Sequence, residues 1–192
     1  MPQSPQLAVR VMMASSGPNE DILGLGSFRQ LLLDNLRIED RDPARTEELV
    51  RIHSEAVAPL ESAIVSPALT QDERKTAILD LAKSLDLLEE AACGPLLAGS
   101  RCTLADASLF PSMSLFSQTL VPHFGWEPWT DEALFYRRPR LHAWYELMKY
   151  EDAARQVEEA VASRLEEVVT DWSELAVDVP TSRVRKFPAH TA

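Results

Sequence analysis

The sequence has little glycine, little cysteine and few aromatic residues. Its 192 residues include 6 glycines and 2 cysteines, and aromatic side chains make up 7%. Scarce glycine argues against turn-rich sandwiches and barrels and favours helices. Cys93 and Cys102 are too few for a disulfide scaffold or a cysteine-rich zinc site. Two free thiols are therefore favoured over a bond between them.

Positive charge is also in short supply. Lysine and arginine number 19 against 30 acidic residues, which gives a net charge of −11. Such a chain repels phosphate backbones, so we expect no nucleic acid among its partners. The longest uncharged stretch, residues 107–126, is only half apolar and holds four serines, so we expect no transmembrane segment.

The composition of 45% hydrophobic and 26% charged residues is typical of a globular protein. We divide the chain into an N-terminal extension (1–45), a helical domain (46–169) and a C-terminal tail (170–192). The first eighteen residues hold no acid, which is typical either of the end of an organelle transit peptide or of an extended arm. We expect an intracellular protein, in the cytoplasm or inside an organelle such as a mitochondrion or plastid.

Local signals predict where the first helices begin. In the extension, Ser27 is expected to cap a short helix from Phe28 to Ile38. The helical domain is expected to begin at Thr46 as N-cap, with a local bend at Pro59. The next helix opens with Thr70-Gln-Asp-Glu73, the pattern of a capping box.

Further helices are predicted up to Val169, giving an all-α domain of five main helices. The second helix stops at Gly94-Pro95, the third starts at Thr103, the fourth starts near Pro139, and the fifth runs from about Asp152. Apolar spacing predicts the residues that point inward: Leu49, His53, Ala56, Val57, Leu60 and Ile64; Ile78, Leu81, Leu85 and Leu88; Leu109, Phe110, Met113 and Phe116; Leu141, Trp144, Leu147 and Met148; Val157, Val161, Leu165 and Val168.

The most informative segment surrounds the start of the third helix. Thr103-Leu-Ala-Asp106 is a capping box in which Thr103 accepts from the backbone of residue 106 and Asp106 accepts from the backbone of residue 103. Such pairing matters where a helix start is buried, because its N–H groups have no water to bind. This places Asp106 in a structural role.

Two motifs resemble the C-terminal helical domain of the cytosolic glutathione transferases. Leu97-Ala-Gly99, Thr103-Leu-Ala-Asp106 and Pro111 match one family motif in order, and residues 138–144 resemble the stretch Tyr-Pro-x-Leu-x-x-Trp, with Arg138 in place of the tyrosine. The resemblance covers about residues 46–169 and implies the family's helical bundle. These motifs hold helices and do not perform chemistry.

In that family a thioredoxin-like domain precedes the helices and binds glutathione. Such a domain needs about 77 residues, whereas 45 precede Thr46 here. The resemblance therefore implies no catalytic residue and no cofactor. The leading interpretation is a non-catalytic protein-interaction or scaffold module, a subunit of a larger assembly. The alternatives are a glutathione-dependent transferase or reductase-like enzyme, and a carrier of an apolar ligand.

Two segments are candidate partner contacts. One is the aromatic loop with Trp126 and Trp129, which fits a contact surface and a lid over the core equally well. The other is the basic tail with Arg183, Arg185 and Lys186. In the family, parts of the first and third helices lie under the thioredoxin-like domain, so we expect a partner protein or a second copy to cover some of their apolar residues here. These residues include Val50, Val57, Leu109, Met113 and Phe116.

The histidines and one cysteine complete the candidates. The four histidines have no metal-ligand spacing, so no metal site is predicted. His53 falls on an apolar face, where a packed, hydrogen-bonded role is favoured over a catalytic one. A reactive thiol at Cys102 is kept as an alternative, because the residue precedes a helix whose dipole would lower the pKa of a thiol there.

Overall fold

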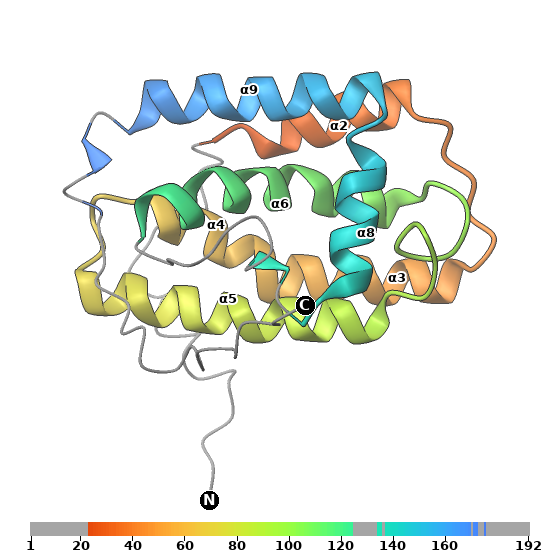
Figure 1. The fold of residues 1–192 in the computed structure, drawn as a ribbon, viewed down its shortest axis with the longest axis horizontal. Helices are drawn as coiled ribbons and strands as arrows, with labels where there is room; N and C mark the ends of the chain where they lie inside the picture. Colours follow the sequence, from red (N-terminus) through yellow and green to blue (C-terminus); the bar gives the residue numbers. More distant parts are fainter. Residues whose placement is uncertain (1–22, 125–133, 136, 170, 173–174, 176–192) are drawn as a thin grey trace, which may run out of the picture.

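The fold is all-α in the part of the chain that the structure describes. The computed structural model describes residues 23–124, 134–135, 137–169, 171–172 and 175. The elements are α2 (Leu25–Asn35), α3 (Pro43–Ile52), the π-helical turn η1 (His53–Val57), α4 (Ala58–Val65), α5 (Gln71–Ala91), α6 (Leu104–His123), α8 (Pro139–Met148) and α9 (Asp152–Val168) (Figure 1). The prediction of an all-α domain is confirmed at this level.

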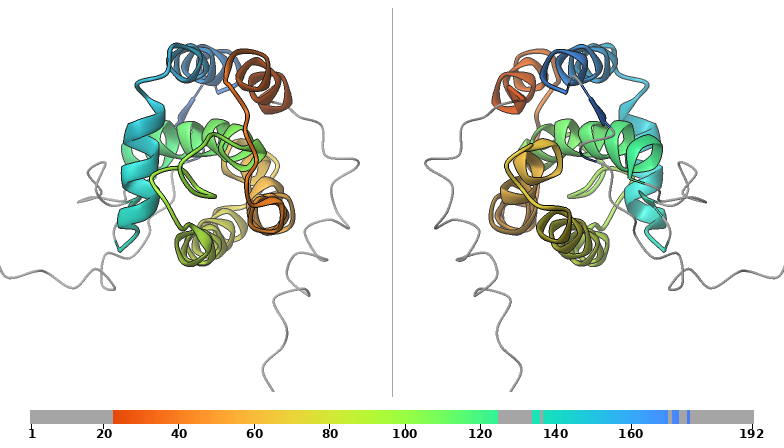
Figure 2. Two further views of the ribbon diagram at one scale, coloured as in Figure 1. Left: turned by 90° about the vertical axis from the view of Figure 1, so that its right-hand side faces the viewer. Right: turned by 90° about the vertical axis from the view of Figure 1, so that its left-hand side faces the viewer.

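The long helix α6 lies in the middle of the bundle. Seen end-on, α2 and α9 lie on one side of it, α3, α4 and α5 lie on the other, and α8 crosses a third side (Figure 2). Its predicted inward residues are buried, as are polar residues such as Ser112 and Thr119. A helix surrounded by neighbours needs apolar residues on every side, which explains its composition.

Helix α2 begins three residues earlier than predicted. Its N-cap is Gly24, in a left-handed conformation with φ of 70°, and the N–H of Ser27 donates to Gly24 O over 3.0 Å. Ser27 therefore already lies in the first turn and is not the cap. Glycine takes this conformation without the strain that a side chain would add. The helix packs on α6 and α9, and Leu32 is fully buried.

The prediction that Thr46 caps the first long helix is also wrong. α3 begins at Pro43, and Asp42 Oδ1 accepts the N–H of Arg45 over 3.1 Å. Thr46 is buried inside the helix, where its hydroxyl donates to Asp40 Oδ1 over 3.0 Å. Proline is favoured at the first helical position because its fixed φ suits a helix and its missing N–H is not needed there.

An irregular turn interrupts the run from α3 to α4. In η1, the N–H of Ala58 donates to the carbonyl of His53, five residues back. Pro59 follows directly. In regular α geometry its ring would collide with the carbonyl of Glu55, so a wider turn at this point relieves the clash. The predicted irregularity near Pro59 thus takes the form of a π-helical turn, and Leu49, Val57, Leu60 and Ile64 all point inward.

Helix α5 and the turn after it follow the local signals closely. The capping box between Thr70 and Glu73 is formed, and the predicted stripe is buried. The helix ends at Ala91, just before Gly94-Pro95. Gly94 lies against the backbone of Gly99, so close that a Cβ on it would stand 2.4 Å from the Gly99 oxygen. A side chain at position 94 would therefore collide with the backbone of Gly99.

The last two helices begin close to the predicted positions. In α8, Leu141, Trp144 and Met148 point inward, but Leu147 does not: 42% of it is exposed. Together with Tyr145, which is also buried, these residues complete one face of this ten-residue helix, and Leu147 lies on another. In α9, Val157, Val161 and Leu165 are buried as predicted.

The end of the described chain folds back onto the bundle. The Trp172 ring stacks on His123, with ring centres 3.7 Å apart, and meets Phe124 edge-on. Leu175 is buried, and its carbonyl accepts from the Arg74 guanidinium over 3.3 Å. This closes the end of the bundle at which α6 stops.

The apolar residues of the first and third long helices are covered by the chain itself. Val57, Leu109, Met113 and Phe116 are buried, and Val50 is partly buried against the same core. These four residues therefore belong to the core and need no partner to cover them, whereas the expected partner protein or second copy stays a prediction. Part of the cover comes from α2, which packs along α6. Among the described helices, none combines the length and apolar composition needed to cross a membrane.

Candidate functional site

Asp106 lies at the centre of a buried hydrogen-bond cluster. Its Oδ2 accepts from the Thr103 N–H over 2.7 Å and from the Thr103 hydroxyl over 2.9 Å. Its Oδ1 accepts from the Leu97 N–H over 3.0 Å and from the Trp144 indole over 2.8 Å. One carboxylate thus joins the start of α6, the preceding turn and α8. The predicted capping box is formed.

The electrostatics of Asp106 fit a structural role. The residue is fully buried, and that burial raises its pKa, against the opposing effect of the hydrogen bonds from Leu97, Thr103 and Trp144. All four donors point at the carboxylate, so both oxygens are used by the protein. Nothing of the group is left to contact a substrate.

Two further charged side chains, one buried and one partly buried, bind backbone groups and were not identified from the sequence. Glu89 of α5 accepts the N–H groups of Arg140 and Leu141, over 3.1 and 2.9 Å, and so caps α8 from a neighbouring helix. Arg138 donates to Asp86, to Leu134 O and to Ala82 O. Apart from Leu134, which is four residues from Arg138, these partners lie about fifty residues apart in sequence, so no local pattern signals them.

The two cysteines are not bonded to each other, and Cys102 is not an activated thiol. Cys93 and Cys102 are free thiols, as predicted. The expectation of a lowered thiol pKa at Cys102 is wrong, because burial, with smaller effects from Asp106 and Glu151, raises the pKa of this thiol to about 12. At neutral pH it is therefore protonated and a poor nucleophile.

A second polar cluster joins η1, α4 and α6. The Ser112 hydroxyl donates to Glu61 Oε1 over 2.5 Å, and His53 Nε2 lies 2.8 Å from the same hydroxyl oxygen. Glu61 Oε1 and His53 Nε2 are 3.5 Å apart. The hydrogen bond predicted for His53 is present, but the carboxylate partner was not foreseen. Both ionisable side chains keep some contact with solvent, 12% for His53 and 16% for Glu61.

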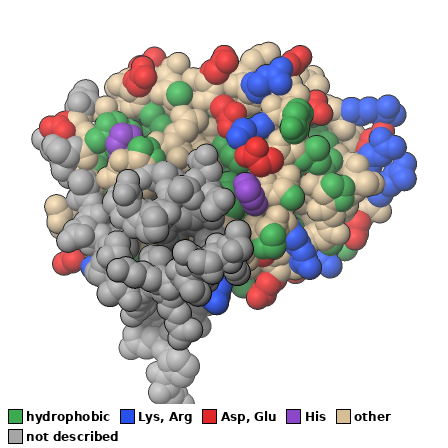
Figure 3. Space-filling model, viewed as in Figure 1, with side chains coloured by type: hydrophobic (Ala, Val, Ile, Leu, Met, Phe, Trp, Pro, Cys, Tyr) green, Lys and Arg blue, Asp and Glu red, His purple; other side chains and the backbone are tan. Residues whose placement is uncertain are grey.

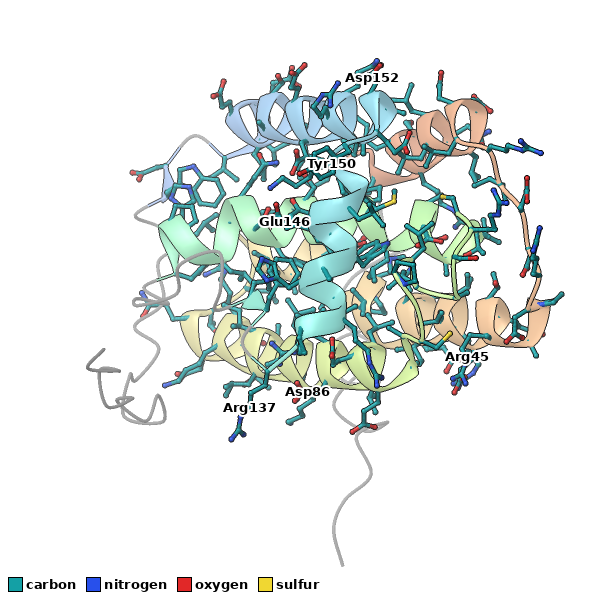
Figure 4. The ribbon with its side chains drawn as sticks, turned by 45° about the vertical axis from the view of Figure 1, so that its right-hand side comes forward. Arg45, Asp86, Arg137, Glu146, Tyr150 and Asp152 are labelled. Carbon is teal, nitrogen blue, oxygen red and sulfur yellow. The ribbon has the colours of Figure 1, made fainter. Side chains whose placement is uncertain are left out.

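The outer side of α8 presents apolar side chains to solvent. Ala143, Leu147 and Tyr150 follow one another at intervals of four and three residues, and all are exposed, Tyr150 by 81%. Tyr150 stands at the corner between α8 and α9, near Glu146 and Asp152 (Figure 4). In the space-filling view, hydrophobic side chains reach the surface over and beside α8, among acidic and basic ones (Figure 3).

The predicted contact residues lie elsewhere in the chain. Trp126, Trp129, Arg183, Arg185 and Lys186 fall outside the described residues. Within the described residues, no group of three or more His, Cys, Asp or Glu side chains is placed to hold a metal ion.

Comparison of the chain with protein-family models, with curated proteins and with solved structures finds no match. The resemblance to the helical domain of the glutathione transferases remains a prediction from the motifs at residues 97–111 and 138–144. The class that the structure defines is an all-α bundle built around a buried central helix.

Proposed function

We propose that this chain is a non-catalytic protein-interaction module and works as a subunit of a larger assembly. Its bundle would then be similar to the C-terminal domain of the glutathione transferases, here serving as a scaffold. The observation that carries the proposal is the pair of apolar stripes on α8.

A helix that covers a core on one side needs a single apolar stripe. The inner stripe of α8 meets the bundle and consists of Leu141, Trp144, Tyr145 and Met148. The outer stripe, which consists of Ala143 and Leu147 on the helix and Tyr150 two residues past its end, is exposed. Tyrosine is among the residues that dominate binding energy at protein interfaces, because its rigid ring buries a large area at a small entropic cost.

The corner that carries Tyr150 is held in place. Arg155 of α9 donates to the carbonyls of Lys149 and Tyr150 at the end of α8. The Lys149 ammonium also lies 5.4 Å from the centre of the Tyr145 ring. A partner would therefore meet a surface whose backbone is already ordered, which lowers the entropic cost of binding.

Affinity capture from an extract of the native source tests the proposal. The bait would be the wild type, a variant of the outer stripe (Leu147→Asp with Tyr150→Ala), and a matched control on α5 (Leu87→Asp with Leu79→Ala). The control residues are large, apolar and exposed by 50% and 40%. Each variant thus replaces one exposed leucine by aspartate and shortens one large apolar side chain to alanine, at different places.

We expect one set of proteins to be captured by the wild type and the α5 control and lost by the α8 variant, with all three baits equally folded by circular dichroism. Capture that is the same for all three baits would contradict the proposal. Loss of capture by the α5 control alone would move the contact surface to α5.

A further inference from the structure

The tautomer of His53 follows from the hydrogen bonds of Ser112. A serine hydroxyl has one proton, and the proton of Ser112 goes to Glu61 Oε1. The hydroxyl oxygen must then accept in its contact with His53, so Nε2 of His53 carries a hydrogen and donates it over 2.8 Å. In a neutral imidazole this leaves Nδ1 without a hydrogen, as an acceptor.

Nδ1 is unused by the described part of the protein. It has no hydrogen-bond partner among the described residues. The side chain as a whole is not sealed from solvent, at 12% exposure. A hydrogen bond that fixes one nitrogen of an imidazole as the donor fixes the tautomer and the orientation of the ring, as it does for histidines that bind metals or act in catalysis. Here Ser112, itself bound to Glu61, fixes both.

We propose that Glu61, Ser112 and His53 form a hydrogen-bond relay that makes Nδ1 of His53 a proton-accepting site for a small ligand bearing an O–H or N–H group. The relay holds His53 in one orientation from two other elements, α4 and α6. It also begins at a π-helical turn, an irregularity that is frequent at functional sites. This relay does not involve the outer stripe of α8, so the two proposals can be tested separately.

An acylating reagent reads out the reactivity of Nδ1. With diethyl pyrocarbonate, the Nδ1 lone pair forms a bond to a carbonyl carbon, and the anhydride C–O bond breaks to release ethyl carbonate. The Nε2 proton passes to Ser112, whose own proton passes to Glu61, so charge is not left on the ring. Removing either relay member should slow the step.

The experiment measures the modification rate of each histidine by peptide mass spectrometry, at a pH at which imidazoles are neutral. Wild type, Ser112→Ala and Glu61→Gln are compared, and His142, which stacks on Phe135 outside the cluster, is the internal control. We expect His53 to be modified several-fold more slowly in both variants, with the rate at His142 unchanged. Equal rates at His53 in all three proteins, or no modification of His53 in the wild type, would overturn the relay.

A second measurement needs only the wild-type protein. Two-bond ¹H–¹⁵N spectra should show His53 as the Nε2–H tautomer, and titration with phenol, a simple O–H donor, should shift its Nδ1 resonance to saturation. The Nδ1–H tautomer would disprove the relay. Absence of a phenol-induced shift would show that the cluster is a clamp between helices and not a ligand site.

Discussion

At the scale of single residues, the described interior uses its charged side chains to bind backbone groups. Asp106 and Glu89 accept N–H groups at helix starts, and Arg138 and Arg74 donate to carbonyls. Arg74 is buried, its Nε has no hydrogen-bond partner among the described residues, and burial lowers its pKa. Among the described residues, the buried charges of Asp106, Arg138 and Arg74 thus serve to hold the fold together, whereas Glu89, His53 and Glu61 are only partly buried.

Replacement of Asp106 by alanine should destabilise the fold by about 3 kcal/mol. The change leaves the N–H groups of Leu97 and Thr103 and the indole of Trp144 buried without an acceptor. Urea unfolding measures the loss. Asp80→Ala, which removes a carboxylate paired with Lys83 near the surface, should stay within about 0.5 kcal/mol of the wild type. Similar midpoints for the two variants would contradict the role assigned to Asp106.

Acid should weaken the closed end of the bundle through His123. Burial lowers its pKa below the ordinary value of 6.5, so the unfolded chain binds the proton more readily than the folded one. The stability is therefore complete above that value and decreases as the pH falls through the folded pKa. Urea unfolding followed by tryptophan fluorescence at several pH values measures this loss of stability, because Trp172 stacks on His123.

His123→Phe is the control, because it keeps a ring against Trp172 but cannot titrate. We expect the stability of this variant to fall less steeply between neutral and mildly acidic pH. The same slope in both proteins would show that other groups carry the pH dependence.

At the scale of elements, local chemistry was a good guide and distant contacts were not. The boxes Thr70–Glu73 and Thr103–Asp106 were predictable because all their atoms lie within four residues. The starts of α2 and α3 were misplaced because Ser27 and Thr46 resemble caps. An available signal was Asp42 directly before Pro43, an N-cap followed by the residue best suited to the first turn.

Most of the candidate site could not be predicted from the sequence. Ser112 and His53 are 59 residues apart, and Ser112 and Glu61 are 51 apart. Their meeting depends on how α4 and α6 pack and on the extra residue in η1. Periodicity placed His53 on an inward face but could not name its partners. The outer stripe of α8 was missed because Leu147 fits an inward stripe as well as an outer one.

Glu89→Ala should loosen α8 without disturbing α5. Glu89 accepts the first free N–H groups of α8, at Arg140 and Leu141, and loss of a cap costs about 1 kcal/mol. Hydrogen exchange at these two amides should become faster. The neighbouring change Glu90→Ala removes an exposed carboxylate and should leave both rates unaltered. Equal exchange in both variants would mean that Glu89 does not cap the helix.

At the scale of the whole molecule, the described part of the extension belongs to the bundle. α2 lies along both α6 and α9, and its Leu25 and Leu32 join the same core as the long helices. The boundary at Thr46 is therefore a position in the sequence and not a division in packing. Helix α2 and the long helices share one hydrophobic core.

Leu32→Ala should therefore destabilise the entire bundle, by about 3 kcal/mol, because it leaves a cavity under α2. Urea unfolding followed by tryptophan fluorescence and by far-ultraviolet circular dichroism should give one shared, shifted transition. Gln30→Ala, on the exposed side of α2, should leave the midpoint nearly unchanged. If α2 were only loosely attached, Leu32→Ala would leave the midpoint of urea unfolding as nearly unchanged as Gln30→Ala does.

The π-helical turn η1 also determines how this chain tolerates changes of length. It holds one residue more than an α-helical turn would, inside a run whose two halves are otherwise regular. Because the extra residue is taken up within the turn itself, deleting one residue from η1 and rewinding the turn as α-helix would leave the inward faces of α3 and α4 nearly aligned. A deletion in the regular part of α3 or α4 would instead rotate one segment by about 100° against the other. The turn is thus the place at which this run of helix can lose a residue with the least change in which side chains face the core.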